Sequence, residues 1–214
     1  MARIVFDLDG TLIDSAPDIG GIANGVLSRR GLEPITLAQT RDFVGSGPGV
    51  FIQKMRGARG LPDSQQDALL SEFMASYDTA VDLTQPYPGV VAALEGLRDS
   101  GHRLGICTNK PIRPTMTVLR HLDLVQNFET FVGGDSLAVH KPHPDPLHAA
   151  FADLGQGRAI FVGDSEVDAA TAQAADVPFL LFTEGYRKSP VDTLPHARAF
   201  SHFDALSGLI ETLA

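Results

Sequence analysis

Five short apolar runs, separated by stretches with helical spacing, constrain the fold of this 214-residue chain more than any other feature of its sequence. The runs are rich in β-branched and aromatic residues, a pattern that predicts short buried strands. Strands that alternate with helices predict an α/β fold with a doubly wound parallel sheet. Right-handed crossovers then bring the carboxyl ends of all the strands to one edge of that sheet. The runs are residues 4–6, 103–107, 129–132, 159–162 and 178–182.

An insertion interrupts this alternation between the first and second predicted strands. Residues 16–82 contain no convincing strand, and their apolar residues follow helical spacing. We therefore predict an α/β core formed by residues 1–15 and 83–214 and an all-helical domain formed by residues 16–82. Four helices are predicted in the insertion, at residues 19–27, from a capping-box pattern at 36–39, at 49–59 and at 69–77.

The net charge limits the partners that this chain can have. It is formally −9, so the surface repels nucleic-acid phosphates and anionic lipid. A small anionic substrate is still compatible with this net charge, because a metal, a lysine or helix N-termini can supply positive charge at the binding site. Cys107 is the only cysteine, which excludes an internal disulfide and fits a reducing compartment. With no signal-peptide core and no apolar run of membrane-spanning length, we predict a cytoplasmic protein that binds neither nucleic acid nor membrane.

Two acidic residues directly after the first predicted strand are the strongest chemical signal. Asp7 and Asp9 are two residues apart, so both can face the crevice at the strand end as the chain turns, and Gly10 permits a tight turn there. Adjacent carboxylates repel each other, so a divalent cation or a shared proton is expected between them. The alternative for the motif alone is a polar turn with a helix N-cap at Asp9.

Three further polar elements follow predicted strands or lie in a rigid loop. Thr108 and Asn109 come directly after the second strand, where a hydroxyl and an amide can hold a phosphoryl oxygen or simply form a turn. Lys141 stands beside two prolines, so it is either a fixed ammonium group or a surface lysine. Asp164 and Asp168 follow the fourth strand, and their spacing of four suits one face of a helix, although each is also a candidate cap.

These elements are all predicted at the same edge of one sheet. A turn, a helix cap or a surface lysine can explain each element by itself, but these explanations do not account for all of them meeting at one edge. Three or four carboxylates together suit Mg²⁺, which prefers oxygen ligands and bridges to phosphate. The sequence has no cysteine–histidine cluster with zinc spacing. Prolines between His140, His143 and His148 oppose a shared metal site there.

The four motifs, in this order, resemble those of the haloacid dehalogenase superfamily. The resemblance extends over essentially the whole chain, because the predicted helical insertion lies where that superfamily has its C1-type cap. It implies a Rossmann-like core, a mobile helical cap and a requirement for Mg²⁺. The motifs are Asp7-Leu8-Asp9-Gly10-Thr11, Thr108-Asn109, Lys141, and Gly163-Asp164 with Asp168.

The resemblance also implies a role for each motif. Asp7 would attack phosphorus, and Asp9 would protonate the leaving alkoxide and then activate water. The metal ligands would be the Asp7 and Asp164 side chains and the Asp9 backbone carbonyl, with Gly10, Thr11 and Asp168 in support. Thr108, Asn109 and Lys141 would hold the phosphoryl group.

Within the superfamily, Asp9 disfavours dehalogenation, because members that remove halide lack this second aspartate. Thr11 is more similar to the phosphatases than to the phosphosugar mutases. Residues 14–18, 43–47 and 108–110 resemble the phosphoglycolate phosphatases most. A cap loop of Gly45, Ser46 and Gly47 either enters the site and selects the substrate or only connects two helices. Likewise, Lys54, Arg56 and Arg59 either meet a substrate carboxylate or form a solvated basic face.

The sequence therefore predicts a phosphatase that acts on a small phosphorylated metabolite through an aspartyl-phosphate, with 2-phosphoglycolate as the favoured substrate. Alternatives within the superfamily are a phosphosugar phosphatase, a pyrophosphatase or a phosphoglucomutase-like enzyme. An alternative of another class is a receiver-like signalling module, which also places aspartates, a hydroxyl and a lysine on a parallel sheet. The sequence favours neither a monomer nor a homodimer.

Overall fold

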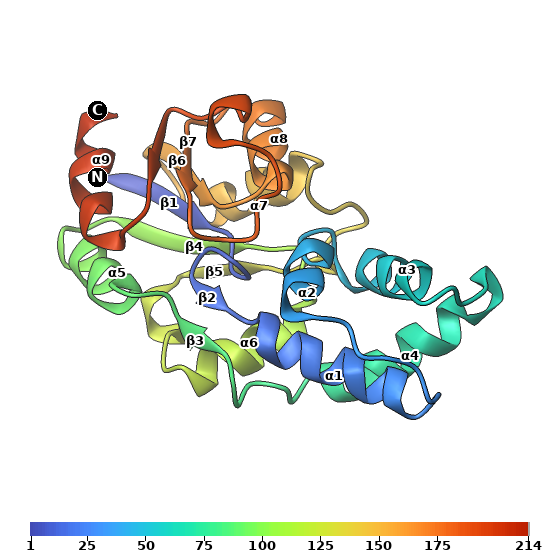
Figure 1. Cartoon of the computed structure of the whole chain (residues 1–214). Coiled ribbons are helices and arrows are strands. Elements are labelled where there is room, and N and C mark those ends of the chain that lie inside the picture. The colour runs from blue at the N-terminus through green and yellow to red at the C-terminus, as the bar shows by residue number, and fades with distance from the viewer. Residues whose placement is uncertain (214) are drawn as a thin grey trace.

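A six-stranded, fully parallel sheet forms the centre of the larger part of the molecule (Figure 1). The computed structural model describes residues 1–213. All five predicted strands are present, and a sixth, of three residues, extends one edge of the sheet. In spatial order the strands are β5 (Thr130–Val132), β4 (Arg103–Cys107), β1 (Ala2–Phe6), β6 (Arg158–Gly163), β7 (Phe179–Phe182) and β8 (Arg198–Phe200).

This strand order reverses direction beside β1. The chain passes from β1 outward to β4 and β5, then returns to the other side of β1 for β6, β7 and β8. In open α/β sheets, ligands bind in the crevice at the carboxyl ends of the strands where the order reverses. The topology therefore points to the ends of β1 and β6 as the place for a site.

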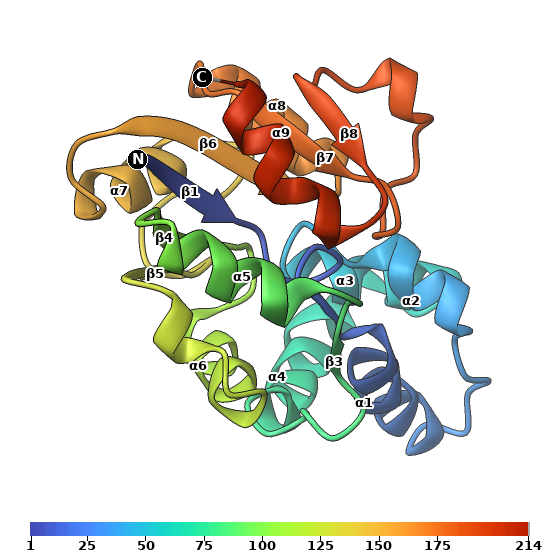
Figure 2. The same ribbon diagram turned by 90° about the vertical axis from the view of Figure 1, so that its left-hand side faces the viewer.

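Helices cover both faces of the sheet, as the alternation of side chains along the strands requires. Ile4 and Phe6 of β1 point to one face and pack with apolar residues of three helices, whereas Val5 points to the other face and packs with two. Figure 2 shows helices of the first set in front of the sheet and those of the second set behind it. The first set is α5 (Val90–Asp99), α6 (Ile112–His121) and α9 (Leu206–Thr212); the second is α7 (Asp145–Asp153) and α8 (Glu166–Ala174).

The predicted helical insertion is present and has an apolar cluster of its own. Its buried residues, from Ile19 to Tyr77, form a cluster separate from the two that line the sheet. The capping box predicted at residues 36–39 is confirmed, with Thr36 and Gln39 bonding reciprocally. Figure 1 shows the insertion beyond the carboxyl edge of the sheet. Its helices are α1 (Ala16–Ser28), α2 (Leu37–Phe43), α3 (Pro48–Ala58) and α4 (Gln66–Tyr77). Among residues 1–213, no helix is both long and apolar enough to cross a membrane.

The chain enters and leaves the insertion through two short strands that the sequence did not reveal. β2 (Ile13–Asp14) and β3 (Gln85–Pro86) pair antiparallel, so the two connections lie side by side. Asp18, at the start of α1, reinforces this pairing. Its Oδ2 accepts hydrogen bonds from the Leu83 backbone N at 3.0 Å and from the Thr84 backbone N and Oγ1 at 2.7 and 2.6 Å.

Replacing Asp18 with alanine is expected to lower the free energy of unfolding by about 2–3 kcal/mol. The change removes a charged acceptor and leaves buried donors at Thr84 without a partner. Equilibrium unfolding in urea measures the loss. The exposed Asp99 of α5 provides a matched control, because Asp99→Ala should change the stability by less than about 0.5 kcal/mol. Equal stabilities of Asp18→Ala and the wild type would contradict the assigned role.

Candidate active site

Polar residues begin where the three neighbouring strands β4, β1 and β6 end. Asp7 directly follows β1, and its backbone N donates to the Val162 carbonyl at 2.9 Å. Thr108 directly follows β4, and Asp164 directly follows β6. The strand ends therefore bring residues that are far apart in sequence to one edge of the sheet, as the sequence predicted.

Lys141 joins this edge from the segment between β5 and α7. Its Nζ donates to Asp7 Oδ1 at 2.8 Å and to Asp168 Oδ1 at 2.6 Å, and the residue is only 2% exposed. Burial disfavours the ammonium charge, but Asp168 and Asp7 outweigh that effect and raise the pKa of Lys141. It is therefore a fixed, permanently charged group beside Asp7, not a surface lysine.

The first turn of α8 positions Asp168. Ser165 is the N-cap and forms a capping box with Asp168, whose Oδ2 accepts from the Ser165 backbone N at 3.1 Å and hydroxyl at 2.6 Å. Its other oxygen accepts from Lys141. Asp168 thus stabilises the start of α8 as the third helical residue of this capping box, and it also holds the ammonium of Lys141. Asp164 is not the cap; Ser165 is.

Asp164 is held by two groups from opposite sides. The Thr11 hydroxyl donates to its Oδ1 and the Tyr186 backbone N donates to its Oδ2, both at 2.6 Å. Gly10 has a φ of +89°, and a Cβ at that position would lie 2.6 Å from Asp164 Oδ2, so the turn after Asp9 requires glycine. Sequence patterns did not single out Tyr186, because its contact with Asp164 is made by the backbone N, which every residue type except proline has.

Asp7, Asp164 and Asp168 form a buried cluster that could hold a cation. Among residues 1–213, they are the group whose potential ligand atoms all lie within 4.8 Å of one another. Burial, then repulsion from Asp168, raises the pKa of Asp7 to about 7 although Lys141 opposes the shift. Burial, Asp168 and Asp7 likewise raise the pKa of Asp164 well above its usual range. Three carboxylates beside one ammonium leave two negative charges, so the cluster suits a divalent cation with oxygen ligands.

Asp9 has different surroundings from Asp7. Its Oδ1 accepts from the Ser15 hydroxyl at 2.5 Å and faces the ammonium of Lys110 at 3.3 Å. The Asp9 side chain is therefore not part of the carboxylate cluster. Two carboxyl groups in such distinct environments can take different roles in catalysis.

Asn109 connects three parts of the site. Its Nδ2 donates to the backbone carbonyls of Lys141 at 2.9 Å and Gly45 at 3.0 Å. Its Oδ1 is buried and has no hydrogen-bond partner within residues 1–213. The side-chain amide thus ties the Lys141 loop to the loop between α2 and α3, while its predicted contact with a phosphoryl group stays a prediction.

A pocket lies between this edge and the helical insertion. Acidic and polar residues line it from the core, whereas the insertion contributes mainly apolar residues and glycines. The core residues are Asp7, Asp9, Thr108, Asn109 and Lys110; those of the insertion are Ile19, Val44, Gly45, Gly47, Pro48, Phe51, Phe73 and Tyr77. Ser46, between the two lining glycines, borders a neighbouring outer groove.

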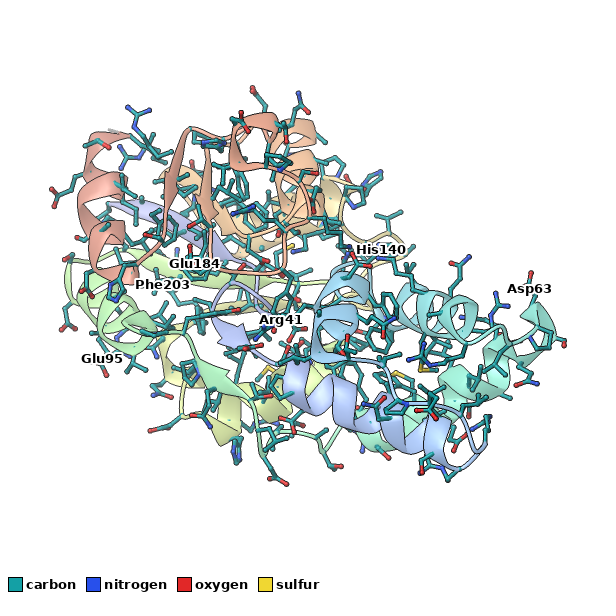
Figure 3. All side chains as sticks on the ribbon, in the orientation of Figure 1. Arg41, Asp63, Glu95, His140, Glu184 and Phe203 are labelled. Carbon is teal, nitrogen blue, oxygen red and sulfur yellow. The ribbon has the colours of Figure 1, made fainter. Side chains whose placement is uncertain are left out.

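The three basic residues that the sequence considered for a substrate carboxylate lie elsewhere. Lys54 donates to the Asp42 carbonyl at 2.9 Å, and Arg59 donates to the Glu33 and Pro34 carbonyls at 2.7 Å. Arg56 pairs with Asp63, which Figure 3 labels at the far tip of the insertion. None of the three lines the pocket beside Asp7.

The histidines and the cysteine have structural surroundings. His140 contacts the Lys141 carbonyl, His143 contacts Asp145, and His148 contacts the Ala175 carbonyl, so the three do not converge on one point. Cys107 is fully buried at the end of β4, and burial raises the pKa of its thiol to about 12. It is a core residue.

Three features define a class of hydrolases with a Rossmann-like sheet. They are the reversing strand order, the acid pair after the central strand and the buried carboxylate cluster. A family model described as haloacid dehalogenase-like hydrolase matches residues 4–182, and the chain belongs to this family. The resemblance predicted from the sequence is therefore confirmed.

Several known proteins are similar to this chain over nearly its full length. The chain is 48% identical over 216 residues to the phosphoglycolate phosphatase of Cereibacter sphaeroides (strain ATCC 17029 / ATH 2.4.9), which covers 100% of this chain and 99% of the relative. It is 44% identical to the phosphoglycolate phosphatase of Rhodobacter capsulatus, over 97% of this chain and 96% of the relative. The crystal structure of a predicted phosphoglycolate phosphatase from Haemophilus somnus 129PT superimposes with a TM-score of 0.90 at 27% identity, covering 98% of both chains.

Proposed function

We propose that this protein is a phosphatase that hydrolyses 2-phosphoglycolate to glycolate and inorganic phosphate. The observation that carries the proposal is the full-length identity of 48% to a phosphoglycolate phosphatase. The geometry supports a phosphomonoesterase, because Asp7 faces a fixed cation and lies in a pocket with a second, separately positioned acid. The pocket is small and largely apolar on the insertion side, which suits a small substrate.

The chemistry proceeds in two steps. Asp7 Oδ attacks phosphorus and the bond from phosphorus to the ester oxygen breaks, while Asp9 donates a proton to the departing alkoxide. Asp9 then removes a proton from water, and the resulting hydroxide attacks the aspartyl-phosphate to release phosphate and restore Asp7. Lys141 stabilises the charge on the phosphoryl oxygens, with the Thr108 hydroxyl as a further donor beside it. The Asn109 side-chain amide already donates to the Lys141 and Gly45 carbonyls, so it would support the phosphoryl group by positioning the Lys141 loop. Separate surroundings of Asp7 and Asp9 support this division of roles.

Mg²⁺ is the cation that the carboxylate cluster would hold. Side chains of Asp7 and Asp164 and the Asp9 backbone carbonyl would be the ligands, and Asp168 would act through Lys141, to which it is bonded. When bound, the ion would neutralise charge on the phosphoryl group. Hard oxygen donors and the excess negative charge of the cluster support this choice.

Mg²⁺ affinity is expected to rise by at least about tenfold between pH 6 and pH 8, because Asp7 alone accounts for about tenfold and the raised pKa of Asp164 acts in the same direction. In the metal-free protein the pKa of Asp7 is about 7, so at pH 6 the ion must displace a proton that is absent at pH 8. Isothermal titration of the substrate-free protein with MgCl₂ at the two pH values measures the change. Asp7→Asn, which lacks this titrating group, should show a shallower dependence, and a wild-type affinity independent of pH would contradict the assignment.

We also propose that residues 16–82 act as a cap on a core of residues 1–15 and 83–214. The separate apolar cluster of the insertion and its paired connections support this division. Gly45 and Gly47 border the pocket, which supports a role for the loop of Gly45, Ser46 and Gly47 in selecting the substrate. A cytoplasmic location stays a prediction from the sequence.

A phosphate-release screen tests the proposed function. Purified protein is assayed with 2-phosphoglycolate, several sugar phosphates and pyrophosphate, each with and without Mg²⁺. We expect the highest kcat/KM for 2-phosphoglycolate with Mg²⁺. A higher value for a sugar phosphate or pyrophosphate would favour the alternative phosphatases, conversion of a sugar phosphate into an isomer without free phosphate would indicate a mutase, and no turnover at all would favour a phospho-accepting module.

A further inference from the structure

We propose that Lys110, assisted by the hydroxyl of Tyr77, binds the carboxylate of the substrate and thereby selects phosphomonoesters of short 2-hydroxy acids. This inference rests on the proposed function and adds the residue that recognises the organic part of the substrate.

Lys110 occupies a buried position beside the acid/base residue. It is 6% exposed and lines the pocket, and its Nζ lies 3.3 and 3.5 Å from the two carboxylate oxygens of Asp9. Charge-assisted hydrogen bonds between ammonium and carboxylate are usually about 2.7–2.9 Å long. The contact with Asp9 is therefore loose, and the ammonium keeps donor capacity for a second carboxylate.

Tyr77 places that ammonium at the boundary between core and insertion. Lys110 Nζ is 3.0 Å from Tyr77 Oη and 4.3 Å from the centroid of its ring. Tyr77 is the last residue of α4 and lines the same pocket. A lysine of the core and a tyrosine of the insertion thus converge where the insertion covers the site.

Other cations near the site are already engaged. Among the described residues that line the pocket, Lys110 is the one with a positive charge, and Lys141 behind it is bonded to both Asp7 and Asp168. The insertion contributes apolar walls such as Phe51 and Phe73. A carboxylate that entered this pocket would lose its hydrating water. Without a cationic partner to replace that water, its burial would carry a large free-energy cost.

The spacing between Lys110 and Asp9 fits a short acid. Asp9 must reach the ester oxygen to protonate it, and in 2-phosphoglycolate one CH₂ group separates that oxygen from the carboxyl carbon. Three bonds separate the ester oxygen from each carboxylate oxygen, which puts these atoms about 3 Å apart. An ammonium 3.3 Å from Asp9 is therefore within reach of this carboxylate.

The position of Lys110 leaves room for one more acceptor. Its Nζ contacts the Asp9 carboxylate and the Tyr77 hydroxyl, and an ammonium group has three donor hydrogens. A buried ammonium discriminates between substrates, because a substrate without a carboxylate leaves one of its donor hydrogens without a partner.

The test compares two substrates that differ only in the recognised group. Ethyl phosphate has a methyl group where 2-phosphoglycolate has its carboxylate, so the ratio of their kcat/KM values measures carboxylate recognition. Lys110→Met should lower this ratio at least roughly thirtyfold, mainly through a higher KM for 2-phosphoglycolate, because one partner of a buried charge pair is removed. Tyr77→Phe should lower it less, by about three- to tenfold.

Controls separate recognition from folding and from general damage. Lys54→Met replaces a lysine bonded to the Asp42 carbonyl and should leave the ratio unchanged. If Lys110→Met does not fold, Lys110→Gln keeps a donor for Tyr77 without the charge and should lower the ratio to a similar extent. Equal losses for both substrates in the Lys110 variants would overturn this proposal, while a wild type that still prefers 2-phosphoglycolate would leave the proposed function standing. A wild type that cleaves ethyl phosphate as efficiently as 2-phosphoglycolate would overturn both.

Discussion

Asp7→Asn should abolish phosphate release while the protein stays folded. An amide is a far weaker nucleophile than a carboxylate, so no aspartyl-phosphate forms. Folding should survive, because burial raises the pKa of Asp7 to about 7, which means that the fold disfavours a negative charge at this position relative to water. Asparagine is a neutral side chain of nearly the same shape. We expect kcat below about a hundredth of the wild-type value.

Two measurements check this expectation. Single-turnover assays with 2-phosphoglycolate and Mg²⁺ measure the chemical step, and the thermal midpoint of the metal-free protein at pH 8 measures folding. The exposed Asp99 of α5 offers a matched control, since Asp99→Asn should retain full activity. If Asp7→Asn kept more than about a hundredth of the wild-type kcat, Asp7 would not be the nucleophile.

Lys141→Ala is expected to lower kcat roughly 10²–10³-fold, as does the loss of one oxyanion-stabilising donor in other enzymes. The change removes the cation that contacts both Asp7 and Asp168 and leaves these two carboxylates uncompensated. Because Lys141 lowers the pKa of Asp7, its removal should raise that pKa further. More of the nucleophile is then protonated near neutral pH, so the loss should be larger at pH 6 than at pH 8.

Steady-state kinetics at the two pH values, with Mg²⁺ held below saturation so that protonation of Asp7 still competes with metal binding, measure both effects. Lys54→Ala is a matched control, because its Nζ donates to the Asp42 carbonyl and does not reach the pocket. A loss smaller than about threefold for Lys141→Ala would show that its ammonium does not act on the phosphoryl group. A loss that is equal at pH 6 and pH 8 would argue against its effect on Asp7.

The main strands and the position of the motifs could be predicted from the sequence because both depend on local patterns. A buried strand is an apolar run, and parallel strands share an edge, so residues after β1, β4 and β6 had to come together. β8 was missed because three edge residues, one of them an exposed arginine, carry no periodicity. β2 and β3 are shorter still. They are strands because they pair with each other, and two residues are too few to show a strand pattern in the sequence.

Side-chain partners in the site were harder to predict. Lys110 follows Thr108 and Asn109, the two residues of this motif for which the sequence suggested a role. Only the folded structure shows that Lys110 contacts Tyr77 of α4 and Asp9. The backbone N of Tyr186 holds Asp164 across 22 residues of sequence, and no pattern marks such a bond. Arg56 was a candidate for a substrate carboxylate, but its partner Asp63 becomes apparent only when α3 and the turn after it are placed.

The pairing of β2 with β3 has a consequence for how such a chain can change. Because Ile13 lies opposite Pro86, the two connections that lead into and out of the inserted segment are about 5 Å apart. A segment with adjacent ends imposes little loop-closure cost on the fold that accepts it, whatever its length. The α/β part can therefore accept a different inserted segment in a relative without rearranging its own strands. Because we propose that the inserted segment selects the substrate and that the strand ends carry the chemistry, these two properties can then diversify independently.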